Sequence, residues 1–275
     1  NFRSDVLGSA AVLAGLFASR AGFPAADPIA ALVVAGAGGR VAKHGNRAVS
    51  SSCGSADVLE ALGVTIDLSP EQMARVLGKA GIAFLFAPKL HPAMASVAAV
   101  RKELGVRTIF NVLGPLTNPA FARRQVLGVF DPSLVETVGA VLAELGADRA
   151  LVVHGRDGLD EISLCDTTLV AEVNAGQVRS YEISPEEMGV DRIDPESIRG
   201  DDAATNASIA RRILEGEPGP ARELIAVNAG AALYAAGLAD SIKEGIAQAR
   251  QTIDSGAALA KLDELIRVTA EESRR

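Results

Sequence analysis

Short apolar runs alternate with longer helical stretches in the middle of the chain, and this alternation constrains the fold more than any other feature. The runs Ile82–Ala87, Gln125–Phe130 and Ala150–His154 are typical of strands buried on both faces, as in a parallel sheet. Helical patterns at His91–Leu104 and Pro132–Leu145 lie between them. The spacing is that of βαβ units and predicts an α/β fold, with a mainly parallel central sheet flanked by helices.

The second half of the chain changes pattern twice. Thr168–Val173 and Gln177–Ile183 predict a hairpin at the sheet edge, because Asn174 and Gly176 between them suit the positive φ angles of a tight turn. After Gly200 the pattern is helical almost to the end of the chain. The helices predicted there are Asp202–Leu214, Ala221–Ala236, Ser241–Ser255 and Ala257–Ala270.

The N-terminal region is apolar but weakly patterned. Asp5–Arg20 has apolar residues on nearly every helical face, which predicts a buried helix. Ile29–Gly39 is a second buried element and falls short of the ~20 apolar residues of a membrane span. The sequence begins at Asn1 and lacks the pattern of a secretory signal peptide. We therefore expect no membrane partner.

The charge balance and the cysteines limit the class of protein. Lys and Arg number 27 against 34 Asp and Glu, so the net charge is −7, which argues against nucleic acid as a partner. The two cysteines, Cys53 and Cys165, cannot form a disulfide framework for 275 residues. We expect a protein of the reducing cytoplasm.

The segment from Lys43 to Ser55 is rich in glycine, serine and basic residues, and it precedes a predicted helix at Ala56–Leu62 that Ser55 caps. Backbone N–H groups and hydroxyls in such a loop can bind an anion, and Lys43 and Arg47 add positive charge. A Ser-rich turn with an ordinary helix cap explains the same residues about equally well. The segment matches neither a Walker motif nor a dinucleotide fingerprint.

Two adjacent acids, Asp160 and Glu161, follow the predicted strand Ala150–His154. Carboxylates at the C-terminal end of a parallel strand can hold Mg²⁺ together with substrate phosphates. Acidic pairs are common in this chain, and most such pairs are solvated surface. Only its position after a strand favours this pair as a metal site.

Three other features allow both a structural and a functional interpretation. Asn111–Pro119 is dense in turn formers and is interpreted first as a rigid connection. Arg101 is either a surface residue or a clamp for a carboxylate ligand. His44 and His91 flank the predicted pocket, whereas His154 ends a strand and suits a structural role.

Taken together, these segments closely resemble the anthranilate phosphoribosyltransferase family of tryptophan biosynthesis, whose fold is shared with pyrimidine nucleoside phosphorylases. The match runs from about Ile29 to the C-terminus. It rests on Lys43-His44-Gly45-Asn46-Arg47 with Ser50–Ser55, Phe86-Ala87-Pro88-Lys89 with His91-Pro92, Arg107–Asn111 through Asn118-Pro119, and Gly158-Leu159-Asp160-Glu161.

The resemblance implies transfer of phosphoribose from phosphoribosyl diphosphate (PRPP) to the amine of anthranilate, with release of diphosphate and a requirement for Mg²⁺. Asp160 and Glu161 would bind the metal. The residues implied for PRPP are Lys43, His44, Gly45, Asn46, Arg47, Ala48, Val49, Ser50, Ser51 and Ser55. Those implied for anthranilate are Asn46, Arg101, His44 and His91, with Arg101 on its carboxylate. No catalytic residue is assigned.

The N-terminus departs from the family. The diphosphate-binding Gly-Thr-Gly-Gly-Asp loop falls on Gly15–Ser19, and the Asn-Ile-Ser-Thr segment falls on Ala25–Pro28. The helical region that usually forms the family's homodimer interface is largely absent, so the N-terminal helical part is truncated. We expect an atypical helical segment at 1–28 and a catalytic domain at 29–275. The alternative is a non-catalytic homologue that binds anthranilate and has lost the diphosphate loop.

Overall fold

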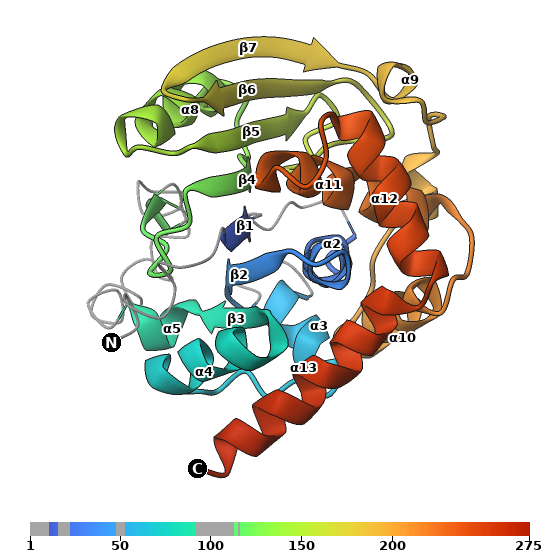
Figure 1. The fold of residues 1–275 in the computed structure, drawn as a ribbon. Helices are drawn as coiled ribbons and strands as arrows, with labels where there is room; N and C mark the ends of the chain where they lie inside the picture. The colour runs from blue at the N-terminus through green and yellow to red at the C-terminus, as the bar shows by residue number, and fades with distance from the viewer. Residues whose placement is uncertain (1–10, 16–22, 48–52, 92–112, 115) are drawn as a thin grey trace, which may run out of the picture.

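The computed structural model describes residues 11–15, 23–47, 53–91, 113–114 and 116–275, and its centre is a seven-stranded sheet in the order β3-β2-β1-β4-β5-β6-β7 (Figure 1). Neighbouring strands from β3 to β5 are parallel, and β6 and β7 continue the sheet in antiparallel fashion. The bounds are β1 Ala11–Gly15, β2 Arg40–Gly45, β3 Ile82–Phe86, β4 Arg124–Gly128, β5 Arg149–Gly155, β6 Thr168–Asn174 and β7 Gln177–Ile183. The predicted α/β class and mainly parallel sheet are confirmed.

The predicted hairpin forms the edge of the sheet. Asn174 pairs with Gln177, so the turn consists of Ala175 and Gly176, which have φ angles of 49° and 80°. Ala175, rather than the predicted Asn174, therefore takes the first left-handed position. The β6–β7 pair places Val173 opposite Val178.

β1 corrects the sequence prediction for the N-terminal region. Residues 11–15 pair in parallel with both β2 and β4, so they form a strand in the middle of the sheet and not part of a buried helix. A short apolar run without period-two alternation is compatible with either element, and here the sheet decides. The helix α2 begins at Ala26 and crosses the expected boundary between residues 28 and 29.

Consecutive residues of the central strands enter two different cores, because side chains alternate across a strand. Val126, Leu151 and Val153 face the larger core, which the C-terminal helices and α2 cover. Leu127 and Val152 face a smaller core closed by α8. Figure 1 shows α8 alongside β5–β7, with α2, α11 and α12 on the other side of the sheet.

The helices largely follow the predicted ranges. They are α2 Ala26–Gly36, α3 Ser55–Ala61, α4 Pro70–Ala80, α5 Ala87–Leu90, α8 Leu134–Glu144, α9 Pro185–Met188, η1 Pro195–Ile198, α10 Ala203–Leu214, α11 Pro220–Ala236, α12 Ile242–Asp254 and α13 Ala257–Ser273. Gly54, rather than Ser55, occupies the N-cap of α3. The predicted helix His91–Leu104 lies outside the described residues beyond His91. Among the described helices, none combines the length and apolar character of a membrane span.

Local sequence signals explain where α4 begins and ends. The Ser69 hydroxyl accepts a hydrogen bond from Gln72 N at 3.2 Å, and the Gln72 side chain accepts one from Ser69 N at 2.7 Å. This reciprocal capping box precedes Pro70 at the first helical position. Gly81, with a φ of 72°, ends the helix in the left-handed conformation.

Two glycines allow α11 and α12 to cross closely. A Cβ at Gly245 would lie 2.2 Å from the Gly230 carbonyl oxygen, and a Cβ at Gly230 would lie 2.5 Å from Ile246 N. Both neighbours are backbone atoms, which cannot move aside as a flexible side chain can. The close crossing fixes α11, the helix that packs on α2 and supports the loop after β5.

Candidate active site

Lys43 lies inside β2, which continues through Gly45, and not in the loop that the sequence predicted. Its side chain is 2% exposed. Nζ lies 2.5 Å from Asp27 Oδ2 and donates a hydrogen bond to the His44 carbonyl at 3.0 Å. Burial raises the pKa of Asp27, although Lys43 acts in the opposite direction. The contact of Lys43 with PRPP phosphates stays a prediction, and here its charge is matched by Asp27.

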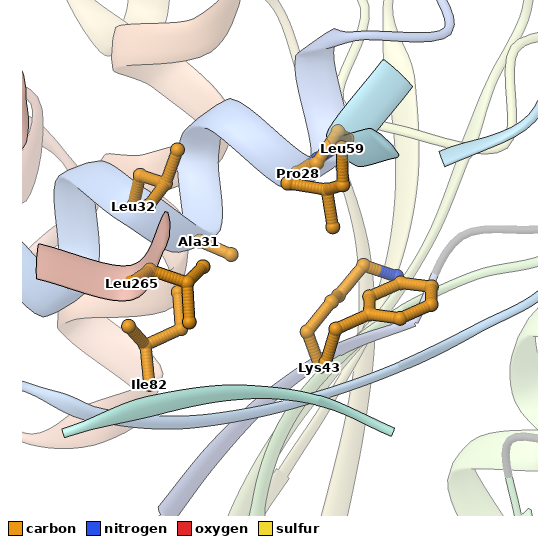
Figure 2. Close-up of a pocket in the computed structure, with 8 residues that line it drawn as sticks. Pro28, Ala31, Leu32, Lys43, Leu59, Ile82 and Leu265 are labelled. Atoms are coloured by element: carbon orange, nitrogen blue, oxygen red, sulfur yellow. The ribbon is translucent and has the colours of Figure 1, made fainter. Parts of the chain in front are cut away.

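The hydrocarbon stem of Lys43 borders a small apolar cavity. Figure 2 shows Lys43 across this space from Leu32, Leu59 and Leu265. The volume is about 10 Å³, which is enough for roughly one water molecule. The cavity is therefore a packing gap beneath the site and not a pocket for a sugar phosphate.

The end of β2 lies against the start of α3. A Cβ at Gly45 would be 2.8 Å from the Phe84 ring and from Ser55 Oγ, so only glycine permits this approach. Ala56 N donates a hydrogen bond to the Asn46 carbonyl at 3.3 Å. The structure thus brings together Gly45, Asn46 and Ser55, three residues of the predicted PRPP set.

Arg47 is exposed and already has acidic partners. Its Nη2 donates a hydrogen bond to Glu60 at 2.8 Å, and Nη1 lies 3.4 Å from Asp57. The guanidinium carbon lies 5.6 Å from the centre of the Phe86 ring. Arg47 therefore lies at the rim of the site. On binding a phosphate, it would replace the carboxylate oxygens of Glu60 and Asp57 with phosphate oxygens.

His44 and His91 meet at the same end of the sheet. Their Nε2 atoms are 3.2 Å apart, and their ring centroids are 5.1 Å apart with the planes at 76°. Burial, His91 and Lys43 lower the pKa of His44 to about 3. Burial also lowers the pKa of His91. Both imidazoles are therefore uncharged near neutral pH.

Asp160 and Glu161 follow β5 after a tight turn. Gly155 N donates to the Leu159 carbonyl at 2.8 Å, and Gly158 takes a φ of 92°. Asp160 and Glu161 are each 5% exposed. The alternative in which this acidic pair is solvated surface is therefore excluded.

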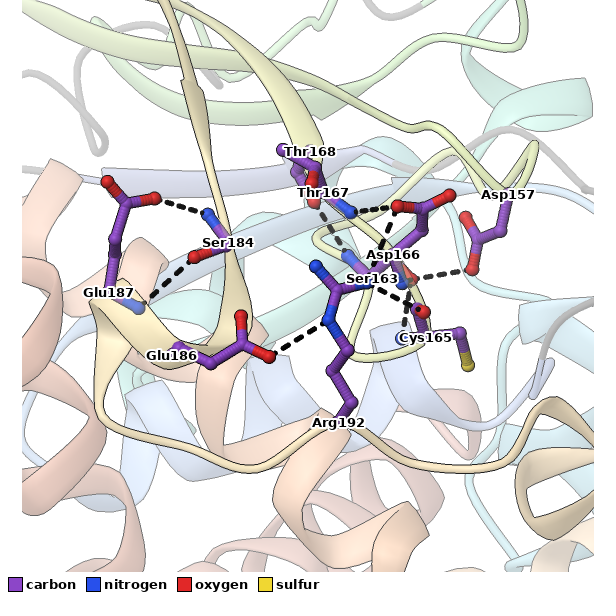
Figure 3. A network of polar contacts seen from close by, with 10 residues as sticks. All are labelled: Asp157, Ser163, Cys165, Asp166, Thr167, Thr168, Ser184, Glu186, Glu187 and Arg192. Atoms are coloured by element: carbon purple, nitrogen blue, oxygen red, sulfur yellow. Dashed lines mark hydrogen bonds and ion pairs between the residues drawn. The ribbon is translucent and has the colours of Figure 1, made fainter.

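Side chains of α11 and of the segment between β5 and β6 hold this turn in place. The Asn228 amide of α11 accepts a hydrogen bond from Ile162 N and donates one to Ile162 O, both at 3.0 Å. Ser163 Oγ donates to Asp157 Oδ2 at 2.5 Å and accepts from Cys165 N at 2.9 Å. Figure 3 shows this network continuing to Arg192. Glu161 thus lies between Asp157 and Ile162, which these hydrogen bonds hold in place.

The charge environment of Glu161 fits a hard cation. Its pKa is raised well above the ordinary value by burial, then by Asp160, Asp27 and Asp157. None of the described residues donates a hydrogen bond to Glu161 Oε2, which is buried. Within the described ranges, no three His, Cys, Asp or Glu side chains converge as a complete metal cage. Mg²⁺ suits such a site, because it commonly takes one or two carboxylates and completes its shell with phosphate oxygens and water.

Asp27 links the two halves of the site. It pairs with Lys43 of β2, and its charge also contributes to the raised pKa of Glu161 after β5. Sequence reasoning assigned no role to Asp27 or to Asn228. Each was visible as a single polar residue beside or within an apolar helical run, and such a residue is buried only with a partner.

Several predicted residues lie outside the described residues. They are Ala48, Val49, Ser50, Ser51 and Arg101. Most of the Asn111–Pro119 connection is described, with Thr117 Oγ1 donating to the Leu113 carbonyl at 2.9 Å. Of the predicted set, the structure places Lys43 to Arg47, Ser55 and His91 at one end of β2 and β3.

Comparison with known proteins identifies the family. A model of the glycosyl transferase family, a/b domain, matches residues 28–259. The anthranilate phosphoribosyltransferase of Thioalkalivibrio sulfidiphilus is 57% identical over 240 residues, which cover 87% of this chain and 71% of that protein. The enzyme of Desulfosudis oleivorans is 59% identical over the same coverage. The chain belongs to the anthranilate phosphoribosyltransferase family.

Solved structures of anthranilate phosphoribosyltransferases share the fold. The Thermus thermophilus structure has a TM-score of 0.88 and 46% identity, covering 94% of this chain and 78% of that one. The Saccharomyces cerevisiae structure in complex with PRPP and Mg has a TM-score of 0.85 and 25% identity, covering 98% of this chain and 78% of that one. Fold and family predictions are both confirmed.

Proposed function

We propose that this chain transfers the phosphoribosyl group of PRPP to the amine of anthranilate and releases diphosphate, with Mg²⁺ as its metal ion. The observation that carries the proposal is the buried Glu161 carboxylate, whose Oε2 no described residue satisfies. A divalent cation would stabilise this carboxylate. The S. cerevisiae relative is in complex with PRPP and Mg.

The reaction forms a bond from nitrogen to the anomeric carbon and breaks the bond from that carbon to the diphosphate oxygen. An aromatic amine is a weak nucleophile, so catalysis depends on stabilising the leaving diphosphate and positioning the amine. Mg²⁺, when held by Asp160 and Glu161, would neutralise charge on the leaving group. Asn46, Arg47 and Ser55 would bind and orient PRPP beside it.

The anthranilate side of the site would be lined by His44, His91 and Asn46, with Arg101 on the carboxylate. The uncharged imidazoles suit the neutral amino group and ring of anthranilate, because they offer ring contact and hydrogen bonding without adding a charge. A second S. cerevisiae structure is in complex with 4-fluoroanthranilate. We further propose that the enzyme works in the cytoplasm, where its two cysteines, Cys53 and Cys165, would stay reduced.

The proposal is tested by following the loss of anthranilate fluorescence with PRPP and Mg²⁺. Glu161→Gln should raise the Mg²⁺ concentration for half-maximal activity about tenfold or more, because it removes a metal ligand. The matched control is Glu182→Gln, an exposed carboxylate on β7 that pairs with Arg156. Its Mg²⁺ titration should equal that of the parent chain, and an equal titration for Glu161→Gln would remove Glu161 from the metal site.

Calorimetry separates the enzyme from the non-catalytic alternative. The proposed enzyme binds PRPP in a manner that depends on Mg²⁺, and it also binds anthranilate. Anthranilate binding without any Mg²⁺-dependent PRPP binding, together with no turnover, would overturn the proposal in favour of a binding homologue.

A further inference from the structure

Two imidazole nitrogens of this chain lie close enough to one another to bind a single metal ion. His44 Nε2 and His91 Nε2 are 3.2 Å apart, and the rings meet edge to face. In a tetrahedral site with metal–nitrogen bonds of about 2.0–2.1 Å, two ligand nitrogens lie roughly 3.3 Å apart. The observed separation is therefore close to that of two ligands on one metal ion.

Regular elements hold both histidines. His44 is the next-to-last residue of β2 and pairs in register with Leu85 of β3. His91 closes the short helix α5 directly after β3, and its N–H donates to the Ala87 carbonyl at 3.0 Å. β2 and the turn of α5 after β3 thus hold the two backbones near one another, so chelation needs rotation of the two rings and no rearrangement of the strands.

We propose that His44 and His91 form a two-imidazole binding site for a transition-metal ion of the Zn²⁺ or Ni²⁺ type. Imidazole nitrogen suits these ions, whereas Mg²⁺ prefers oxygen ligands such as Asp160 and Glu161. No third His, Cys, Asp or Glu among the described residues completes the site. Water would fill each coordination position that no side chain takes.

Metal binding to the two neutral imidazoles releases no net proton. In the metal-free pair, one ring donates its Nε2 hydrogen to the Nε2 of the other ring. Metal binding needs both Nε2 lone pairs, so that hydrogen moves to Nδ1 of its own ring by exchange with solvent. The metal ion gives up two water molecules, and no net proton is released from the two neutral rings.

The site has a consequence that rests on the proposed function. His44 and His91 are among the residues proposed to line the anthranilate channel, so a metal ion bound there would exclude the aromatic substrate. Zn²⁺ would then inhibit in competition with anthranilate, even when Mg²⁺ is saturating. Metal binding itself does not depend on this consequence.

The binding experiment uses the full chain with ¹⁵N-labelled histidine, and Zn²⁺ is added in the presence of excess Mg²⁺. The chain has three histidines, so each ring can be followed. We expect the ring nitrogens of His44 and His91 to shift while those of His154 stay unchanged. His154 is an internal control, because it is buried and its Nδ1 bonds the Val129 carbonyl at 2.8 Å. Zn²⁺ titrations that leave the His44 and His91 signals unmoved would overturn the site.

A variant gives the second measurement. His91 is only partly buried, so His91→Gln should fold, and far-UV circular dichroism checks this. Its Ni²⁺ affinity by calorimetry should fall more than tenfold, and unchanged affinity would overturn the site. Zn²⁺ binding without inhibition would instead contradict the placement of anthranilate, whereas absence of turnover before any Zn²⁺ is added would contradict the proposed function alone.

Discussion

At the scale of single residues, the ion pair between Asp27 and Lys43 stands out because both charged groups are buried. Both side chains are buried, and burial raises the Asp27 pKa despite the nearby ammonium group. For the Asp27 carboxylate, the unfavourable effect of desolvation is thus larger than the favourable electrostatic interaction with Lys43. A pair of this kind gives little net stability compared with an apolar pair, but loss of one partner leaves a buried uncompensated charge.

The buried ion pair predicts that substitutions at its two positions are not additive. Lys43→Met should lower the free energy of unfolding by about 3 kcal/mol, because Asp27 then stays buried without its cation. The double variant Asp27→Leu with Lys43→Met should recover most of that loss. Urea unfolding followed by circular dichroism measures both.

The exposed pair of Arg47 with Glu60 is the matched control. Glu60→Gln should cost less than about 1 kcal/mol, because both side chains are partly solvated. A double variant at positions 27 and 43 that is as unstable as Lys43→Met would contradict the argument. In that case a change in packing, and not the unpaired charge, would account for the loss.

The sequence predicted where Glu161 lies in the fold better than it predicted what surrounds it. Glu161 was placed after a strand correctly, because an acid that follows an apolar run is a local pattern. Its neighbour Asp27 is far away in sequence, and no local pattern specifies such a pairing. Lys43 was assigned to a loop for the same reason, since only the ladder of β2 with β3 shows that the strand reaches Gly45.

At the scale of elements, the same contrast appears in the strands. β3 and β5 were predicted because their apolar runs are bounded by turn residues. β1 was not, because Ala11–Gly15 lies inside a longer apolar stretch that also suits a helix. Pairing with two neighbouring strands decides between these structures, and that information is not local.

Glu272 of α13 links this helix to α4, and we call its contacts with Lys79 and Arg75 the clasp. Glu272 has a fully covered side chain and accepts hydrogen bonds from Lys79 and Arg75, each at 2.7 Å. These bonds hold the pKa of Glu272 at about 2, below its usual 4.5. A lowered carboxyl pKa contributes stability above pH 4.5 that is lost as the pH falls towards 2.

Glu272→Gln should therefore lower the Tm at pH 7 by several degrees and flatten the loss of stability between pH 4.5 and 2. Thermal unfolding at a series of pH values measures both effects. The neighbouring Glu271→Gln is the control, because Glu271 makes only an exposed ion pair with Arg267. Parallel Tm profiles for the parent chain and Glu272→Gln across this pH range would show that the clasp contributes nothing.

At the scale of the whole molecule, β1 joins two parts of the sheet. β2 and β3 lie on one side of it, and β4 to β7 lie on the other. The predicted PRPP residues that the structure describes lie in β2, directly after it and at the start of α3, whereas Asp160 and Glu161 follow β5, so the proposed site spans both parts. The order of strands therefore makes the site dependent on a strand that supplies none of its predicted side chains.

Removal of residues 1–22 should uncouple the two parts, because β2 and β4 would each gain an unpaired edge. Both tyrosines, Tyr181 and Tyr234, lie in β7 and α11, so tyrosine fluorescence reports one part, while far-UV circular dichroism reports all helices. In the parent chain the two signals should change together in urea, and in the truncated chain they should separate. Removal of residues 1–10 alone keeps β1 and should keep the transitions coincident. Coincident transitions in the chain that lacks residues 1–22 would mean that the contacts of α2 with α11 and α13 join the parts without β1.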